Sequence, residues 1–240
     1  MSSRHPSVLL ALAFLACASH GQVATGGISG RVVSQNGAAV RAIVTISPAA
    51  ALGFPSGRAR RCLAGQNGSF VFSGVRPGKY AVCAQVPASE APRSSPPFLD
   101  TCEWGSSLQP VTVSSAQQLT GVTLTVPSGA LLQIQIADPG QLLPVSVSAS
   151  ASKALDPQLA LILRGPDRRV HHPRFISTKN GGRTYQAVVP VATPLTLAVA
   201  SSVASVLDQN GNKVTGEVPA QAASASAATP INFTLVHPGN

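Results

Sequence analysis

The residues best suited to bind a ligand lie between positions 164 and 174 of this 240-residue sequence. The candidate anion-binding residues in this segment are Arg164, Arg168, Arg169, His171 and Arg174. Arginine side chains bind phosphate, sulfate and carboxylate groups through paired, charged hydrogen bonds. The segment is therefore a candidate site for an anionic glycan or another anionic polymer, although the interpretation that we favour is the structural one given next. The alternative is a solvated hairpin in which Asp167 pairs with one of the arginines.

The histidines do not form a recognisable metal site. A zinc peptidase needs two side chains that converge on one metal, as in an H-x-x-E motif. None of the later histidines, His171, His172 and His237, is followed by glutamate at that spacing. Adjacent side chains on a strand point to opposite faces, so His171 and His172 would not chelate one ion together. We expect no metal and no cofactor.

Sequence patterns for hydrolysis are missing as well. Nucleophilic catalysis needs a Ser or Cys beside a His that a carboxylate orients, and the sequence holds no G-x-S-x-G elbow. Its eight acidic residues are scattered, which disfavours a glycosidase with paired carboxylates. We therefore expect a protein that is not an enzyme; the alternative is a hydrolase whose site assembles only in space. The single tryptophan, Trp104, either stacks on a sugar ring or fills the edge of a domain.

The composition limits the fold class and the partners. The chain is 44% hydrophobic but only 10% charged and 4% aromatic, with 21 Gly and 20 Pro. It is too apolar for a disordered chain and too rich in helix breakers for a helical bundle. The net charge of +9 favours anionic partners, but the positive charges are dispersed. Because aromatic and basic residues do not alternate as in single-strand binders, we expect no nucleic-acid partner.

The first 21 residues have the pattern of a cleaved signal peptide. Arg4 and His5 precede the apolar run 8–16 (VLLALAFLA), and small residues follow it. This run is too short to cross a bilayer, which takes about 20 residues of helix. Cleavage after Gly21 or Ala18 predicts a secreted or periplasmic protein of the cell envelope without a transmembrane span. The alternative is a lipid anchor at Cys17.

Three cysteines follow the predicted signal peptide, namely Cys62, Cys83 and Cys102. In an oxidising compartment, this odd number predicts one disulfide and one free thiol. We favour a Cys83–Cys102 bridge, which would close a loop of about 20 residues and stabilise the fold by roughly 3 kcal/mol. The alternative pair is Cys62–Cys83.

The elements that position these residues are expected to be short β-strands, because apolar and polar residues alternate and no window has a capped helical period. The predicted strands are 28–34, 41–47, 69–72, 79–86, 110–114, 121–126, 130–137, 158–164, 184–190, 194–200, 203–207 and 231–236. Four Asn-Gly pairs, at Asn36, Asn67, Asn180 and Asn210, predict two-residue hairpin turns. The Ala/Ser-rich stretch 219–230 is expected to be a loop. The pattern restarts after residue 127, which predicts an all-β fold of two tandem immunoglobulin-like β-sandwich domains, 26–127 and 128–240.

Several segments of the first domain match the pattern of a known family. Residues 28–33 (ISGRVV), 36–40 (NGAAV) and 42–44 (AIV) resemble the opening of the carboxypeptidase regulatory-like domains. The segments 67–72 (NGSFVF) and 74–82 (GVRPGKYAV) match its G-x-F-x-F strand, P-G turn and Y-x-[LV] strand. The resemblance covers residues 26–86, and loosely extends to 127. It implies a transthyretin-like sandwich that serves as a non-catalytic stabilising or interaction domain.

These observations predict a secreted, non-catalytic cell-envelope protein that acts as an interaction or scaffold module. Its expected partner is an envelope or extracellular protein. The alternative function is binding of an envelope glycan or anionic polymer through the basic segment 164–174.

Overall fold

The computed structural model describes residues 24–49, 58–87, 96–104, 109–144, 158–166, 168–179, 181–222 and 229–239. Within these ranges the chain forms sixteen β-strands and no helix, which confirms the predicted all-β class. Consequently, the described part contains no helix that could cross a membrane. Four of the strands are ones that the sequence did not predict, namely β3 (Arg60–Leu63), β10 (Val170–His171), β11 (Arg174–Lys179) and β15 (Glu217–Ala220). The predicted signal peptide 1–21 and the alternative lipid site Cys17 lie outside the described residues and stay predictions.

The N-terminal sandwich consists of two sheets built from residues 26–126. Its first sheet has the order β4-β1-β7, with β4 at Ser69–Val75, β1 at Gly26–Ser34 and β7 at Gln118–Val126. Its second sheet has the order β3-β2-β5-β6, with β3 at Arg60–Leu63, β2 at Ile43–Pro48, β5 at Gly78–Gln85 and β6 at Gln109–Val113. Alternate residues of both sheets bury one shared apolar core, in which Phe70 and Phe72 meet edge to face.

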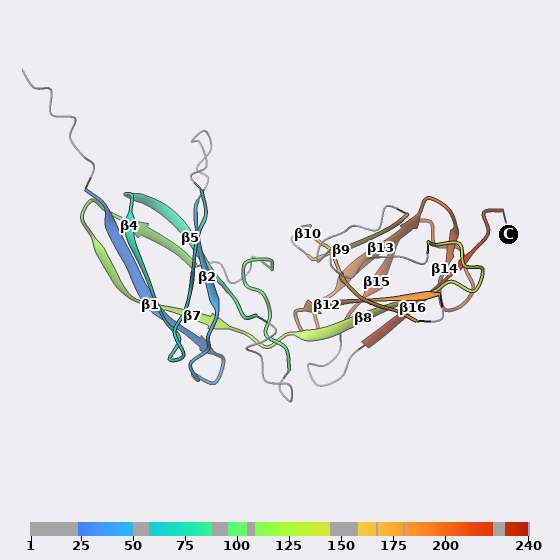
Figure 1. The fold of residues 1–240 in the computed structure, drawn as a ribbon, viewed down its shortest axis with the longest axis horizontal. Helices are drawn as coiled ribbons and strands as arrows, with labels where there is room; N and C mark the ends of the chain where they lie inside the picture. Colours follow the sequence, from blue (N-terminus) through green and yellow to red (C-terminus); the bar gives the residue numbers. More distant parts are fainter. Residues whose placement is uncertain are drawn as a thin grey trace, which may run out of the picture.

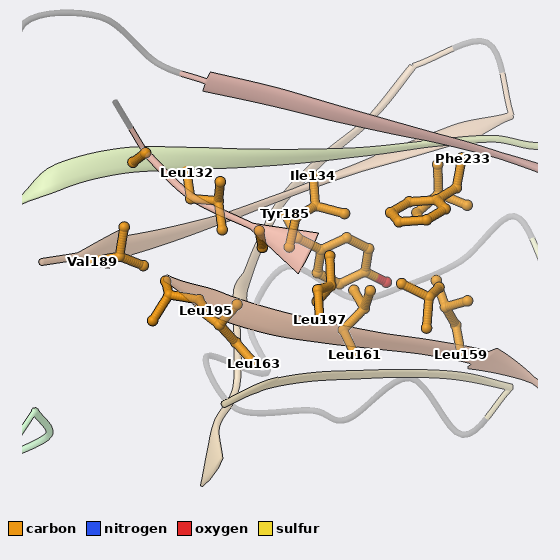
Figure 2. Close-up of a cluster of buried hydrophobic side chains, with 14 of the residues drawn as sticks. Leu132, Ile134, Leu159, Leu161, Leu163, Tyr185, Val189, Leu195, Leu197 and Phe233 are labelled. Carbon is orange, nitrogen blue, oxygen red and sulfur yellow. The ribbon is translucent and has the colours of Figure 1, made fainter. Parts of the chain in front are cut away.

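The C-terminal sandwich uses residues 130–236. One sheet has the order β11-β12-β8-β16-β14, with strands Arg174–Lys179, Gly182–Val189, Ala130–Ala137, Thr229–Val236 and Ser205–Leu207. The other has the order β10-β9-β13-β15, with strands Val170–His171, Leu159–Arg164, Leu195–Ser201 and Glu217–Ala220. Figure 2 shows Leu132, Ile134 and Phe233 facing the leucines of β9 and β13 across the interior.

The second sandwich repeats the topology of the first. β1 pairs antiparallel with β4 and parallel with β7, just as β8 pairs antiparallel with β12 and parallel with β16. The facing sheets also correspond strand for strand, since β3-β2-β5-β6 and β10-β9-β13-β15 are both wholly antiparallel. β11 and β14 extend the second copy at its edges. The chain therefore holds two tandem β-sandwiches, side by side along the long axis of Figure 1.

The turns differ in part from the hairpins that the Asn-Gly pairs predict. Gly37 and Gly68 do adopt positive φ angles of 80° and 76°. The antiparallel bridge Val33–Ala39 closes the turn at Asn36, as a hairpin requires. However, this turn leads from β1 to β2 and the turn at Asn67 from β3 to β4, so both continue into strands of opposite sheets. The Asn-Gly pair stabilises the turn itself, whereas the burial of both apolar faces decides which strands pair. The β11–β12 connection at 180–181 joins paired strands, although Asn180 lies outside the described residues.

Two short strands lie where sequence patterns indicated loops. β3 carries Arg60 and Arg61 and lies at a sheet edge, where charged side chains are tolerated. β15 includes Pro219 and Ala220, which the sequence assigned to the Ala/Ser-rich loop. Proline is acceptable there because β15 is also an edge strand.

Candidate functional site

The most elaborate polar and aromatic arrangement lies where the two sandwiches meet. It is built on residues 96–104, which we call the interdomain strap, and on the linker 127–129 that joins β7 to β8. The strap is covalently bound to β5 by the Cys83–Cys102 disulfide, the pairing favoured from the sequence. Next to it, Thr101 Oγ1 accepts a hydrogen bond from Ala84 N at 2.8 Å, and Thr101 N donates to Ala84 O at 3.2 Å. The strap thus lies against β5 like a short additional strand.

Strand register explains why Cys83 does not pair with Cys62. On β2, Val44 lies opposite Cys62 and the next residue, Thr45, lies opposite Cys83. Because adjacent residues of a strand point to opposite faces, the two cysteines are on opposite sides of the sheet. Cys62 is a free thiol facing the core, and burial raises its pKa, which disfavours the reactive thiolate.

Asp100 shapes the turn that carries the strap toward the second sandwich. Its carboxylate accepts hydrogen bonds from the backbone N–H groups of Cys102 at 2.8 Å and Glu103 at 3.2 Å, and from Gln85 Nε2 at 2.6 Å. Burial nevertheless raises the pKa of the Asp100 carboxyl above its ordinary value, because loss of hydration outweighs these bonds. The turn is closed by a hydrogen bond from Trp104 N to Asp100 O at 3.0 Å, and Trp104 is the last residue of the strap.

Trp104 is buried in the C-terminal sandwich. Its side chain is 6% exposed and belongs to the core cluster of that sandwich, together with Leu99 of the strap. The indole Nε1 donates to Val188 O of β12 at 2.9 Å. The ring stacks on the imidazole of His171, with 3.8 Å between centroids and 15° between planes. Trp104 therefore fills a domain edge, the second of its two predicted roles, and its ring is not free to stack on a sugar.

Further contacts complete this junction. Glu103 Oε1 lies 3.3 Å from His171 Nδ1. Leu99 N donates to Pro127 O at 2.9 Å, and Gly129 N donates to Pro97 O at 2.7 Å, so the strap also binds both ends of the linker. The sandwiches are consequently joined at two places, through the chain itself and through the strap.

Two of the predicted anion-binding residues, His171 and Arg174, lie apart from Arg164. His171 lies on β10 opposite the buried Leu163 and is itself 3% exposed, so its ring points inward against Trp104. Arg164 lies opposite Val170 on the outer face of the same sheet, whereas Arg174 belongs to β11 in the other sheet. Arg168 occupies the turn before β10 with a φ of 60°; Asp167 lies outside the described residues.

The side chain of Arg164 is bound to an acidic partner. Its Nε donates to Glu217 Oε1 on β15 at 2.7 Å, and Thr196 Oγ1 of the intervening β13 donates to the other oxygen of this carboxylate. The Thr196 hydrogen bond, followed by Arg164, lowers the pKa of Glu217 below its ordinary value. The Arg164 guanidinium is therefore engaged in an ion pair with Glu217, and the anion-binding site as a whole stays a prediction.

Other chemical sites are sparse in the described ranges. No group of three or more His, Cys, Asp or Glu side chains there is arranged to hold a metal ion. A shallow groove of about 450 Å³ lies beside β13, lined by Val199, Ser201, Ala204, Lys213, Thr215 and Glu217 among others. Its charged residues are one lysine and the glutamate already paired with Arg164, so no catalytic constellation lies within it.

No family model matches the sequence, and no curated protein matches it either. Among solved structures, an ancillary pilin of Streptococcus is 10% identical with a TM-score of 0.38, over 88% of this chain and 62% of the pilin. A minor pilin of Streptococcus agalactiae is 10% identical with a TM-score of 0.33, over 90% of this chain and 98% of the pilin.

The TIE protein of Bacillus anthracis is also 10% identical, with a TM-score of 0.33. The match covers 89% of this chain but only 34% of that protein. At these scores the comparisons assign no family to the chain and transfer no function to it. The carboxypeptidase regulatory-like label therefore stays a resemblance carried by residues 26–86.

Proposed function

We propose that this chain is a secreted, non-catalytic protein of the cell envelope that acts as an interaction or scaffold module. One observation carries the proposal: the two sandwiches are joined by a three-residue linker and by a disulfide-bound strap. Such a double connection holds the outer strands of both sandwiches at fixed relative positions. That rigidity suits a protein whose role is to place binding surfaces.

The use of polar side chains supports a structural role over a catalytic one. In the part of the chain that is described, Arg164 pairs with Glu217, His171 is packed under Trp104, and Asp100 holds a turn. Each of these groups therefore supports the fold, whereas a hydrolase needs nucleophile, base and orienting carboxylate directed at an open site. The disulfide that holds the strap also suits an oxidising compartment outside the cytoplasm.

The domain limits 26–127 and 128–240 are part of the proposal, with one refinement. The strap lies within the first range, yet Leu99 and Trp104 contribute to the core of the second sandwich. We therefore treat residues 96–104 as shared by both domains. The alternative of glycan or anionic-polymer binding through 164–174 has less support, because its arginines and histidine are dispersed or already paired.

The test combines cross-linking with intact mass. A photo-cross-linking residue is placed at Val71 of β4, which is 69% exposed, and in a second variant at Ile176 of β11, which is 42% exposed. The proposal expects one of these positions to yield a reproducible envelope-protein adduct in living cells. Placing the cross-linker at buried Phe72 provides a matched control, which should yield none.

The captured chain is then weighed intact. Loss of residues 1–21 would support export, and an added lipid mass at Cys17 would identify an anchored form. Recovery of an uncleaved chain from the cytoplasm would overturn the proposed location. Recovery with polymer alone, and with no protein adduct from either edge, would overturn the interaction role in favour of the glycan-binding alternative.

A further inference from the structure

The interdomain strap is attached to the N-terminal sandwich by a bond that depends on redox conditions. Cys83 is 5% exposed, whereas its partner Cys102 is only half-buried, so the bridge has a side that reductants can approach. Around it, the non-covalent ties to β5 are few: the bonds of Thr101 with Ala84 and of Gln85 with Asp100. Phe98 of the strap also packs against the N-terminal core, so the disulfide is the covalent link beside a small set of non-covalent contacts.

The other end of the strap is held by a different kind of contact. Trp104 combines apolar burial, a hydrogen bond to Val188 and stacking on His171, and Glu103 reaches the same imidazole. Fully buried aromatic side chains that also form hydrogen bonds are the usual anchors of protein interfaces. The strap therefore has a covalent anchor in one sandwich and an aromatic anchor in the other.

We propose that this strap is a redox-dependent lock on the relative orientation of the two sandwiches. With the bridge closed, the anchors at Cys102 and Trp104 lie only two residues apart. The second sandwich therefore cannot rotate about the linker unless the Trp104 side chain leaves the core of that sandwich. With the bridge open, the sandwiches stay folded but turn about residues 127–129. The rigid form then belongs to oxidising compartments, and the flexible form to reducing ones.

The opening step is a two-electron reduction by a dithiol. One thiolate of the dithiol attacks a sulfur of the bridge, the mixed disulfide is resolved by the second thiol, and the dithiol closes into its own disulfide. Cys83 and Cys102 each take up one proton. The bridge closes a loop with a sequence separation of 19. By the chain-entropy argument for such a loop, opening the bridge shifts the equilibrium between attached and detached strap roughly 100-fold toward the detached form.

The test measures interdomain geometry in the purified mature chain by small-angle X-ray scattering. The background carries Cys62→Ser, which removes the free thiol without touching the strap. We expect dithiothreitol, or the pair Cys83→Ser and Cys102→Ser, to broaden the distribution of interdomain distances while the circular dichroism of the sheets is kept. Trp104→Ala should cause the same broadening with the bridge still closed.

The combination of variants makes the test specific. If both anchors act through one strap, adding Trp104→Ala to the reduced protein should broaden the distribution no further. Unchanged scattering after reduction would overturn the lock, and so would unchanged scattering of the Trp104→Ala variant with the bridge closed. Loss of sheet signal on reduction would also overturn it, because the bridge would then hold the sandwich itself together. None of these outcomes depends on a partner, so failure here is distinct from failure of the proposed envelope function.

Discussion

The parallel pairing of β1 with β7 requires a residue without a side chain at Gly30, and replacing Gly30 by alanine should cost several kcal/mol. A Cβ at this position would lie 1.8 Å from the carbonyl oxygen of Val122, whereas an ordinary contact begins at 3.4 Å. The oxygen belongs to the backbone of β7, so no flexible side chain can move aside. Gly30→Ala must instead separate the two strands locally.

The size of the effect follows from the ladder. To restore an ordinary contact, β1 and β7 would have to move apart by the difference between 3.4 Å and 1.8 Å. An N–H···O hydrogen bond, normally about 2.9 Å long, does not survive such a displacement. Loss of about three ladder bonds near Val122, at roughly 1 kcal/mol each, is joined by poorer packing of Val122 and Leu124. We expect Gly30→Ala to lower the free energy of unfolding of the N-terminal sandwich by about 3–5 kcal/mol, a large share of an ordinary domain's stability.

The assay is urea unfolding followed by circular dichroism, with Gly74→Ala as the matched control. Gly74 has a φ of 63° but no atom within 4 Å of its Cβ position. Alanine there suffers only backbone strain, at a cost of about 1–2 kcal/mol. If Gly30→Ala costs no more than Gly74→Ala, the close approach of β1 and β7 does not determine stability and the reasoning is refuted.

Three further predictions concern charge, acidity and the thiols. On an anionic polymer column, replacing Arg168 and Arg169 by glutamine should lower the eluting salt concentration no more than replacing Arg58 and Arg61 does, since the positive charge is dispersed. A much larger effect of the first pair would support the predicted anion-binding site. Because burial raises the pKa of Asp100, the native state holds this proton more tightly, and the free energy of unfolding falls as pH rises from the ordinary value of 3.8 to the raised native one. Asp100→Asn should therefore gain stability relative to wild type across that range in pH-dependent urea titrations, and a pH-independent difference would contradict the shift. Alkylation of the unfolded but unreduced mature chain should label Cys62 alone by peptide mass mapping; label on Cys83 or Cys102 would disprove the pairing.

Much of the fold follows from local patterns in the sequence. The alternation of Leu132, Ile134 and Ile136 with glutamines predicts the strand 130–137, which is the observed β8. The all-β class with tandem β-sandwiches is confirmed for the same reason. These features depend on residues close together in the chain, where alternation and turn chemistry act directly.

The arrangement of the strands depends on contacts that no local pattern encodes. Both Asn-Gly turns of the N-terminal sandwich cross between sheets, because joining opposite sheets buries more apolar surface than pairing the flanking strands. Likewise, nothing around Trp104 indicates that it packs on His171, since the two residues come from different sandwiches. Nor does a local pattern indicate that Arg174 lies apart from Arg164, because β10 and β11 are neighbours in sequence but belong to opposite sheets.

The parallel pairing of the first and last strands in each sandwich also determines how the protein would bear tension. Since β1 runs with β7, and β8 with β16, the chain enters each sandwich at one pole and leaves at the other. A pull on the two termini would load these ladders in shear, so their hydrogen bonds resist together instead of opening one by one. Single-molecule stretching should give high and similar rupture forces for the two sandwiches. In a Gly30→Ala chain, the high-force event of the N-terminal sandwich should be lost. Low rupture forces in the wild-type chain would contradict this reasoning. A protein so connected could serve as a tether as well as a spacer.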